Sequence, residues 1–404
     1  MEQTDANSVK STSQIDAKQF IEFDDNLKDK IYTKLQRLPK EHTIVLFLGN
    51  GISSKDLNTN KLVLDFFADI RESDPRQFSD YSSSCDKLLS LIRGIGIEYN
   101  ITDLMEDLSR IDSLRDKFAG FLIKKCCESF SNLNHYYILL IIYLLKNYPE
   151  KKWKVVVFTV NYDNLLEKEY YRIKEFIDKD PSSQIGLPLK PIKDIFTEIG
   201  RPILVIPLKT IQNSEGKFYK PSYVLTETDF NSSRIPIAPI NGSVRVSKCT
   251  NCDTQLQTEA AAVQNQVCTR CGKIVSSIIL PLKEGTSDKS ILALFENIVR
   301  KSSLVIFIGY NFDDPHVNYK LEQGTINYGE GLKIVELQLF VNLLNKKMRD
   351  DVKKNFGKNT EVYEFENDIQ KGLLSILSAF ELIFNVVKTN FLNSYLTLRI
   401  NEEK

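Results

Sequence analysis

Equal numbers of acidic and basic residues, 53 of each along 404 residues, leave this chain with no net charge. A balanced chain has no general attraction to nucleic acids or to membrane surfaces, so its composition argues against both as partners. With 42% hydrophobic residues, it is long enough for one large domain and a smaller one.

The N-terminal part predicts a disordered arm followed by helix. Residues 1–15 are rich in Ser, Thr, Gln and Asp, and we expect them to be disordered. Apolar residues then recur at helical spacing from residue 15 to 38. The N-terminus lacks the basic and apolar segments of a secretory leader, and the most apolar run, 136–145, is too short to span a bilayer. We therefore expect a cytoplasmic protein.

Continuous β-prone runs predict strands that are buried on both faces. They cover residues 43–48, 154–159 and 304–308. Such strands are typical of a parallel sheet covered by helices. Residues 62–150 look mainly helical, including segments 62–70, 88–95, 101–111, 113–130 and 135–148. The fold class that we predict is α/β, a Rossmann-like parallel sheet with a helical insertion and a small ribbon module that contains four cysteines.

Glycine and polar residues follow each of these strands, where ligands bind in open α/β sheets. The first strand ends in Gly49-Asn50-Gly51-Ile52-Ser53, a turn that can bring backbone N–H groups to a pyrophosphate. Such turns are also common without a ligand. Asn161 and Asp163 follow the second strand, and their alternative role is to cap the next helix. His135 opens a helix, and we expect it to be a structural histidine rather than a ligand.

Four cysteines predict a metal-stabilised ribbon. Cys249, Cys252, Cys268 and Cys271 have the spacing C-x2-C-x15-C-x2-C, which is typical of structural zinc. The alternatives are disulfides or buried thiols, which suit the expected reducing compartment less well. Nucleic-acid binding by the ribbon is a weaker alternative because its basic content is modest and no aromatic residues interleave.

The predicted organisation has five parts. Residues 16–243 and 278–365 form the sheet domain, with the insertion at about 62–150, and 244–277 form the ribbon. Residues 366–404 form a C-terminal helical segment whose apolar side chains would suit the core or a homo-oligomer contact.

The chain resembles the sirtuins, a family that consumes NAD, in the order of its motifs. These are the polar turns after the strands, the segment Ile240-Asn241-Gly242-Ser243 and the four-cysteine ribbon. Tyr162, Leu165-Leu166-Glu167 and the segment 309–316 are more similar to the bacterial Sir2-like proteins of antiphage defence than to histone deacylases.

The resemblance implies a role for each site residue. Asn161 would hold the nicotinamide ribose and a reactive water, Asp163 would border the nicotinamide pocket, and Asn241 would stand at the position of the catalytic histidine. The cysteines would hold zinc. The other NAD contacts that the resemblance implies are Gly49, Asn50, Gly51 and Ser53 at the pyrophosphate, Gly309 and Asn311 at the adenosine half, and Thr159.

Departures from the family pattern bear on the activity. The histidine that serves as general base on the ribose is Asn241 here, and an amide has no titratable proton. Val160 replaces the usual Gln, and the Gly-Ile-Pro-Asp-Phe-Arg type of segment after Ser53 is absent. We expect an NAD glycohydrolase of the defence type, acting alone or with an activating protein. The alternatives are a zinc-dependent NAD-dependent deacylase and a catalytically dead subunit that binds NAD or ADP-ribose.

Overall fold

The structure is a computed structural model. The residues that it describes are 25–53, 57, 59–76, 78–79, 112–146, 151–179, 204–205, 208–209, 222–223, 235–249, 251–252, 255–257, 267–268, 270–274, 276–279, 289–310, 312, 314–325, 336–341, 360–364 and 369–384. The predicted arm at 1–15, the predicted helices at 88–95 and 101–111, and Asn311 lie outside these residues.

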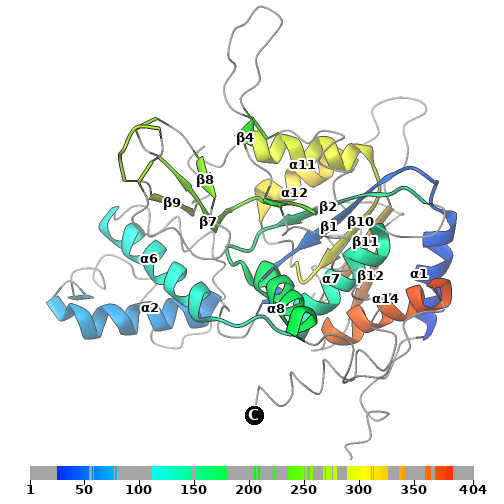
Figure 1. Cartoon of the computed structure of the whole chain (residues 1–404), viewed down its shortest axis with the longest axis horizontal. Coiled ribbons are helices and arrows are strands. Elements are labelled where there is room, and N and C mark those ends of the chain that lie inside the picture. The colour runs from blue at the N-terminus through cyan, green and yellow to red at the C-terminus, as the bar shows by residue number, and fades with distance from the viewer. Residues whose placement is uncertain are drawn as a thin grey trace, which may run out of the picture.

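Among the described residues, seven strands form one sheet in the order β12-β11-β10-β1-β2-β6-β3 (Figure 1). All of its neighbouring strands pair in parallel. Their bounds are β1 Thr43–Leu48, β2 Lys154–Thr159, β3 Leu204–Val205, β6 Pro236–Pro239, β10 Ser302–Ile308, β11 Glu336–Val341 and β12 Thr360–Glu364.

The strand order reverses between β1 and β10. From β1 the chain moves outward to β2, then to the edge strand β3 and back to β6 between them, and from β10 it moves outward through β11 and β12 on the other side. The connections that follow β1 and β10 therefore leave toward opposite faces of the sheet. A reversal of this kind is where open α/β sheets bind their ligands.

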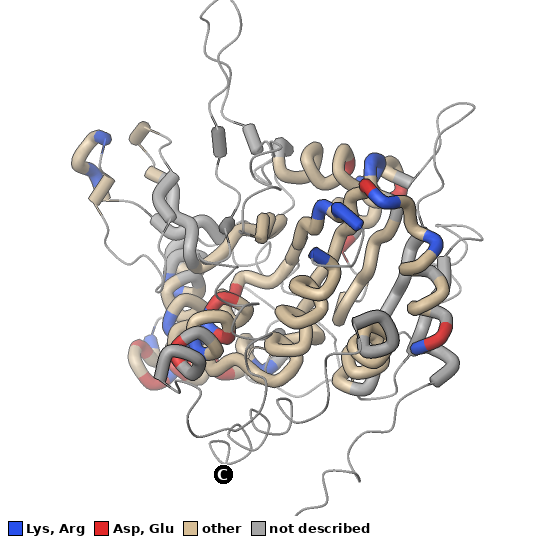
Figure 2. Tube along the Cα trace, turned by 45° about the vertical axis from the view of Figure 1, so that its right-hand side comes forward, with Lys and Arg blue, Asp and Glu red and all other residues tan. Residues whose placement is uncertain are grey.

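Helices cover both faces of the sheet. Along β1, Ile44, Leu46 and Leu48 belong to one core cluster, whereas Val45 and Phe47 belong to the other, as the two-residue period of a strand requires. The first face packs against α1 Asp25–Arg37, α7 Leu133–Lys146, α8 Leu165–Lys179 and α14 Ile369–Phe384, and the second against α11 Lys289–Lys301 and α12 Pro315–Thr325. The central strands β1 and β10 contain no charged residue, and the centre of the sheet is tan in Figure 2.

Two further helices form a unit beside the sheet. They are α2 Thr59–Ser73 and α6 Asp112–Glu128, and their aromatic side chains, including Phe66 and Phe118, pack together. The same cluster includes Tyr162, Leu165 and Val244 from the sheet domain. We call these two helices the α2–α6 unit.

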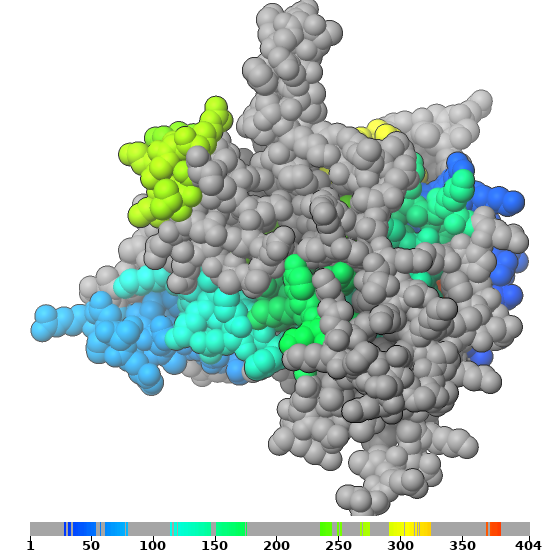
Figure 3. All heavy atoms as spheres, viewed as in Figure 1, coloured from blue at the N-terminus to red at the C-terminus, as the bar shows by residue number. Residues whose placement is uncertain are grey.

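Lys168 of α8 joins the α2–α6 unit to the sheet. Its Nζ donates to the carbonyl oxygens of Cys126, Cys127 and Ser129 at 2.5, 2.9 and 2.9 Å, where α6 ends. A cation at this position satisfies carbonyl groups that the helix leaves without partners. Figure 3 shows α6 and α8, in cyan and green, side by side on the surface.

The ribbon is a small antiparallel sheet with the order β8-β7-β9. It consists of β7 Gly242–Lys248, β8 Gln255–Gln257 and β9 Ser276–Ile279, and β7 directly follows the turn after β6. A separate antiparallel pair joins β4 Leu208–Lys209 to β5 Ser222–Tyr223. The core of the ribbon is the group of cysteines described below.

The structure confirms the predicted strands β1, β2 and β10 and the fold class. It confirms helices at 62–70, 113–130 and 135–148 as α2, α6 and α7, but α7 packs into the sheet core rather than into the α2–α6 unit. The helix α14 also packs there, so its apolar residues are explained by the core. Within the described part of the chain, no helix combines the length and apolar character needed to cross a bilayer.

Candidate functional site

The loops after β1 and β10 touch at the reversal of strand order. The N–H groups of Gly49 and Gly51 donate to the carbonyl oxygens of Ile308 and Gly309, both at 2.9 Å. Gly309 has φ +66°, which favours glycine. The N–H of Ser53 donates to Asn50 O at 3.1 Å. The glycines predicted to contact a pyrophosphate are therefore explained by close backbone packing, with or without a ligand.

Gly49→Ala is expected to destabilise the protein by several kcal/mol. An added Cβ at Gly49 would lie 2.3 Å from Gly309 O, so the two loops must separate. Gly120→Ala is the matched control, because a Cβ there has nothing within 4 Å. In the helix α6 that change should stabilise by about 0.5–1 kcal/mol. Chemical denaturation measures both values, and equal effects would contradict this packing.

Asn161, Ser53 and Asp163 form one hydrogen-bonded group between the ends of β1 and β2. Asn161 Nδ2 donates to Ser53 Oγ at 3.1 Å, and Ser53 Oγ donates to Asp163 Oδ2 at 2.6 Å. The backbone N–H of Asn161 donates to Thr159 Oγ1 at 3.0 Å. Asn161 is buried, and its Oδ1 has no partner in the described part of the chain. The structure thus brings Ser53, Thr159, Asn161 and Asp163 together.

Asp163 also contacts the helix that follows it. Its Oδ1 accepts the N–H of Leu165 at 3.1 Å, as in a helix cap. Burial raises the pKa of Asp163, and the hydrogen bonds from Ser53 and Leu165 act in the opposite direction. Among the described residues, Asn161 bonds to Thr159 and Ser53 rather than to this helix. The capping role therefore applies to Asp163, while Asn161 links the two loops.

Asp163→Asn is expected to raise the melting temperature at pH 8. Because the folded pKa of Asp163 is raised, its ionisation costs stability above that pKa and costs nothing below the unfolded value of about 3.9. The amide removes this cost, so the gain should shrink as the pH falls toward 4. Thermal unfolding from pH 4 to 8 measures it, with Asp69→Asn on the exposed face of α2 as control. A melting temperature of Asp163→Asn that falls further below that of the wild type as the pH rises would contradict this account.

Asn241 lies in the turn between β6 and β7. Its side chain is 2% exposed, and within the described residues its Oδ1 has no partner. Its neighbour is Asp314, whose Oδ1 accepts the N–H groups of His316 and Val317 at the start of α12. Burial raises the pKa of Asp314, while those N–H groups and the Asn241 amide act against the rise. Asn241 thus contacts a buried carboxyl group that sequence reasoning had not selected.

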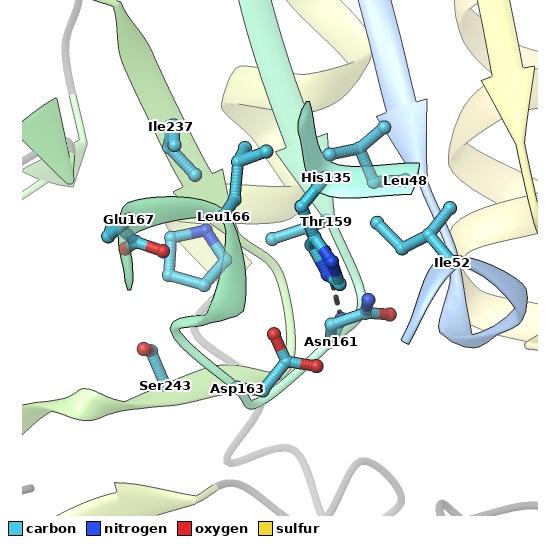
Figure 4. Close-up of a pocket in the computed structure, with 11 residues that line it drawn as sticks. Leu48, Ile52, His135, Thr159, Asn161, Asp163, Leu166, Glu167, Ile237 and Ser243 are labelled. Carbon is cyan, nitrogen blue, oxygen red and sulfur yellow. Dashed lines mark hydrogen bonds between the residues drawn. The ribbon is translucent and has the colours of Figure 1, made fainter. Parts of the chain in front are cut away.

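A small cavity opens beside the Asn161 group. Its volume, counted as the space open to the centre of a water molecule, is about 20 Å³, enough for one water. Figure 4 shows His135, Asn161 and Asp163 around it, with Thr159, Glu167 and Ser243 nearby. Leu48, Ile52, Leu166 and Ile237 provide apolar walls. The sequence indicated His135 only as a structural residue, because a histidine that opens a helix carries no further signal.

The ribbon brings all four cysteines together. The Sγ atoms of Cys249, Cys252, Cys268 and Cys271 lie within 4.8 Å of one another, and among the described residues this is the group suited to a metal ion. Cys249 and Cys271 have sulfurs 3.3 Å apart, and Cys252 and Cys268 3.5 Å, beyond a disulfide bond of about 2 Å. Zinc with bonds of about 2.3 Å needs sulfurs about 3.8 Å apart. The residues therefore fit a tetrahedral zinc site.

A polar site at the reversal of strand order in an open parallel sheet defines a ligand-binding α/β domain of the doubly wound class. Residues 155–350, nearly half of the chain, match the family model of the SIR2-like domain. The resemblance to sirtuins is confirmed at this level. No curated protein shows significant sequence similarity to the chain.

Solved Sir2 structures are similar at low identity. A serine-to-alanine mutant of a Sir2 homologue in complex with ADP ribose is 11% identical, with 91% of this chain and 100% of that chain covered and a TM-score of 0.45. A Sir2 homologue in complex with NAD is also 11% identical, with 90% and 96% covered and a TM-score of 0.45. Sir2 bound to an acetylated peptide is 12% identical, with 83% and 92% covered and a TM-score of 0.36. The assignment rests on the family model and on the strand order of this chain.

Proposed function

We propose that this SIR2-like chain binds NAD at the carboxyl ends of β1, β2 and β10 and hydrolyses the bond between nicotinamide and ribose. The observation that carries the proposal is the buried amide of Asn161, which is fixed by Ser53 and keeps a carbonyl oxygen without a partner among the described residues. A fixed acceptor of this kind can bind a ribose hydroxyl group or a water molecule.

The reaction needs orientation and electrostatic support more than a strong base. When the C–N bond breaks, its electrons go to the nicotinamide nitrogen and positive charge develops on the ribose. Asp163 is an acceptor held by Ser53 and Leu165, and its carboxylate would stabilise that charge. Gly49, Gly51, Gly309, Asn50 and Asn311 remain the proposed contacts to the rest of NAD.

Asn241 favours hydrolysis over protein deacylation. Deacylation by sirtuins uses a histidine to deprotonate the ribose, and loss of a general base typically costs about 100- to 10,000-fold in rate. The buried amide of Asn241 cannot take that proton. Departure of nicotinamide does not require it, so hydrolysis can persist where deacylation does not.

The test measures nicotinamide and ADP-ribose released from NAD by the purified full chain, with and without an acetylated peptide. Hydrolysis predicts equimolar products without the peptide and no acyl-ADP-ribose with it. Peptide-dependent release would instead support the deacylase, and binding of ADP-ribose in calorimetry without any release would support a catalytically dead binding subunit. Failure of both binding and release, with zinc present, would overturn the proposal.

Asn241→His is expected to leave the rate of NAD hydrolysis within about threefold of the wild type, because departure of nicotinamide does not require a base at this position. The new imidazole would lie beside Asp314, an acidic partner that stabilises the charged form of histidine. Initial rates from pH 6 to 9 measure the effect, and Asn241→Gln is the control because it retains an amide. A rise of about 100-fold or more in Asn241→His, over both the wild type and Asn241→Gln, would instead show that a missing base at this position limits turnover.

We also propose that the cysteine group holds a structural zinc ion. With all four positions filled by thiolates, the ion keeps no open position for substrate and contributes stability rather than chemistry. Since β7 leads directly from Asn241 into the ribbon, a folded ribbon fixes one end of the turn that carries Asn241.

A further inference from the structure

His135 has one nitrogen engaged and one directed to the cavity. Its ring is fully buried, and Nδ1 accepts the backbone N–H of Asn132 at 3.2 Å. An accepting Nδ1 places the ring proton on Nε2 in the neutral imidazole. This Nε2 has no partner in the described residues, while the ring lines the same cavity as Asn161 and Asp163 (Figure 4).

Asn132 fixes the position of this ring. Its Oδ1 accepts the N–H groups of Asn134 and His135 at 3.0 and 3.4 Å at the start of α7. Its Nδ2 donates to Ile52 O at 3.1 Å, which ties the start of α7 to the loop after β1. Burial also lowers the pKa of His135 to about 3, so the ring stays neutral at physiological pH. His135 is therefore a fixed hydrogen-bond donor.

The cavity holds a complementary pair. Nε2–H of His135 is a donor, Oδ1 of Asn161 is an acceptor, and neither has a partner in the part of the chain that the structure describes. A buried polar group without a partner costs roughly 1–3 kcal/mol, so native proteins usually satisfy such groups with ordered water. A volume of about 20 Å³ admits one water molecule.

We propose that a buried water molecule accepts a hydrogen bond from His135 Nε2 and donates one to Asn161 Oδ1, and that His135 thereby positions the water that attacks the ribose. This role rests on the proposed NAD hydrolysis. A lone pair of the water forms the new bond to the ribose carbon, after the C–N bond has broken with its electrons on nicotinamide. The proton leaves to the Asp163 carboxylate, which lines the same cavity.

The first experiment reads the water site without any activity. The chain contains only three histidines, so nitrogen-15 labelling of histidine gives a simple NMR spectrum. His42→Gln and His316→Gln assign it by elimination. We expect the His135 ring to remain the neutral Nε2–H form from pH 8 to 5 and to show a cross-relaxation peak from Nε2–H to a bound water. An Nδ1–H form, or an Nε2–H without a contact to water, would overturn the site.

The second experiment tests the role in the reaction. In dilute methanol, the ribosyl intermediate partitions between ADP-ribose and its methyl glycoside. His135→Phe keeps a ring but removes the donor, and it should raise the ratio of methyl glycoside to ADP-ribose about five- to tenfold, the effect of one hydrogen bond. His135→Gln retains a donor and should restore the ratio in part. Asn134→Ala, one residue earlier in α7 and outside the cavity, should leave it unchanged.

The two experiments separate the proposals. If His135 were purely structural, His135→Phe would lower the yields of both products together and leave their ratio unchanged. That result would overturn the positioning role. If the wild-type chain releases no nicotinamide, the proposed hydrolysis and the role of the water in it both fail, while the NMR result still decides whether the water site exists.

Discussion

Asn161→Ala is expected to lower the release of nicotinamide from NAD by at least about 100-fold. The substitution removes the buried Oδ1 and the Nδ2 that holds Ser53, so the substrate loses its proposed acceptor and the loop after β1 loses its link to β2. Since orientation is the main contribution that we assign to this residue, the loss should appear in kcat more than in KM. Single-turnover assays with labelled NAD measure both.

Asn134→Ala is the matched control for Asn161→Ala. Asn134 is also a buried asparagine whose Oδ1 has no partner among the described residues, but it lies outside the cavity. We expect the rate at which the Asn134→Ala variant releases nicotinamide from NAD to stay within about twofold of the wild-type rate. Asn161→Asp serves as a second comparison, because it keeps an acceptor and loses the donor to Ser53. Similar losses in Asn161→Ala and Asn134→Ala would indicate a general effect on folding rather than a site.

Cys268→Ser is expected to reduce bound zinc from about one equivalent to near zero and to lower the melting temperature by about 10 °C or more. Structural zinc contributes about 10–16 kcal/mol to the folding of isolated zinc-finger peptides, and in a larger protein each kcal/mol corresponds to roughly 2–4 °C. Cys268 is buried in the sulfur group, so no water can easily replace its ligand atom. Metal analysis and thermal unfolding measure the two quantities.

Cys127→Ser is the control for the cysteine substitution. Cys127 is an exposed free cysteine at the end of α6, far along the chain from the ribbon. Its zinc content and melting temperature should match those of the wild type. Chelation of the wild-type protein should reproduce the effect of Cys268→Ser, and a chelated protein with an unchanged melting temperature would contradict a structural metal.

The sheet could be predicted from the sequence because its central strands are buried on both faces. The run Thr43–Leu48 is apolar and buried at every position after the first, and this pattern separates it from helices and from half-exposed strands. The short strand β6 and the helices α11 and α12 were not predicted. Pro236 and Pro239 weaken the strand pattern of β6, and its partners β2 and β3 are distant in sequence.

The candidate site was predicted in part. Asn161 and Asp163 were found because polar residues directly after a buried strand point to the ligand edge of a parallel sheet. His135 and Asp314 were missed as site residues because each also caps or opens a helix, a sufficient explanation by itself. Only the three-dimensional arrangement shows that His135 shares a cavity with Asn161 and that Asp314 lies beside Asn241.

The chain between Asn161 and Leu165 serves two neighbours at once. Asn161 and Asp163 face the cavity, whereas Tyr162 and Leu165 are packed into the aromatic cluster of the α2–α6 unit. Lys168 ties the same segment to the end of α6. A protein that binds and displaces α2 and α6 would therefore shift the few residues that carry Asn161 and Asp163. The geometry of the cavity would change with them.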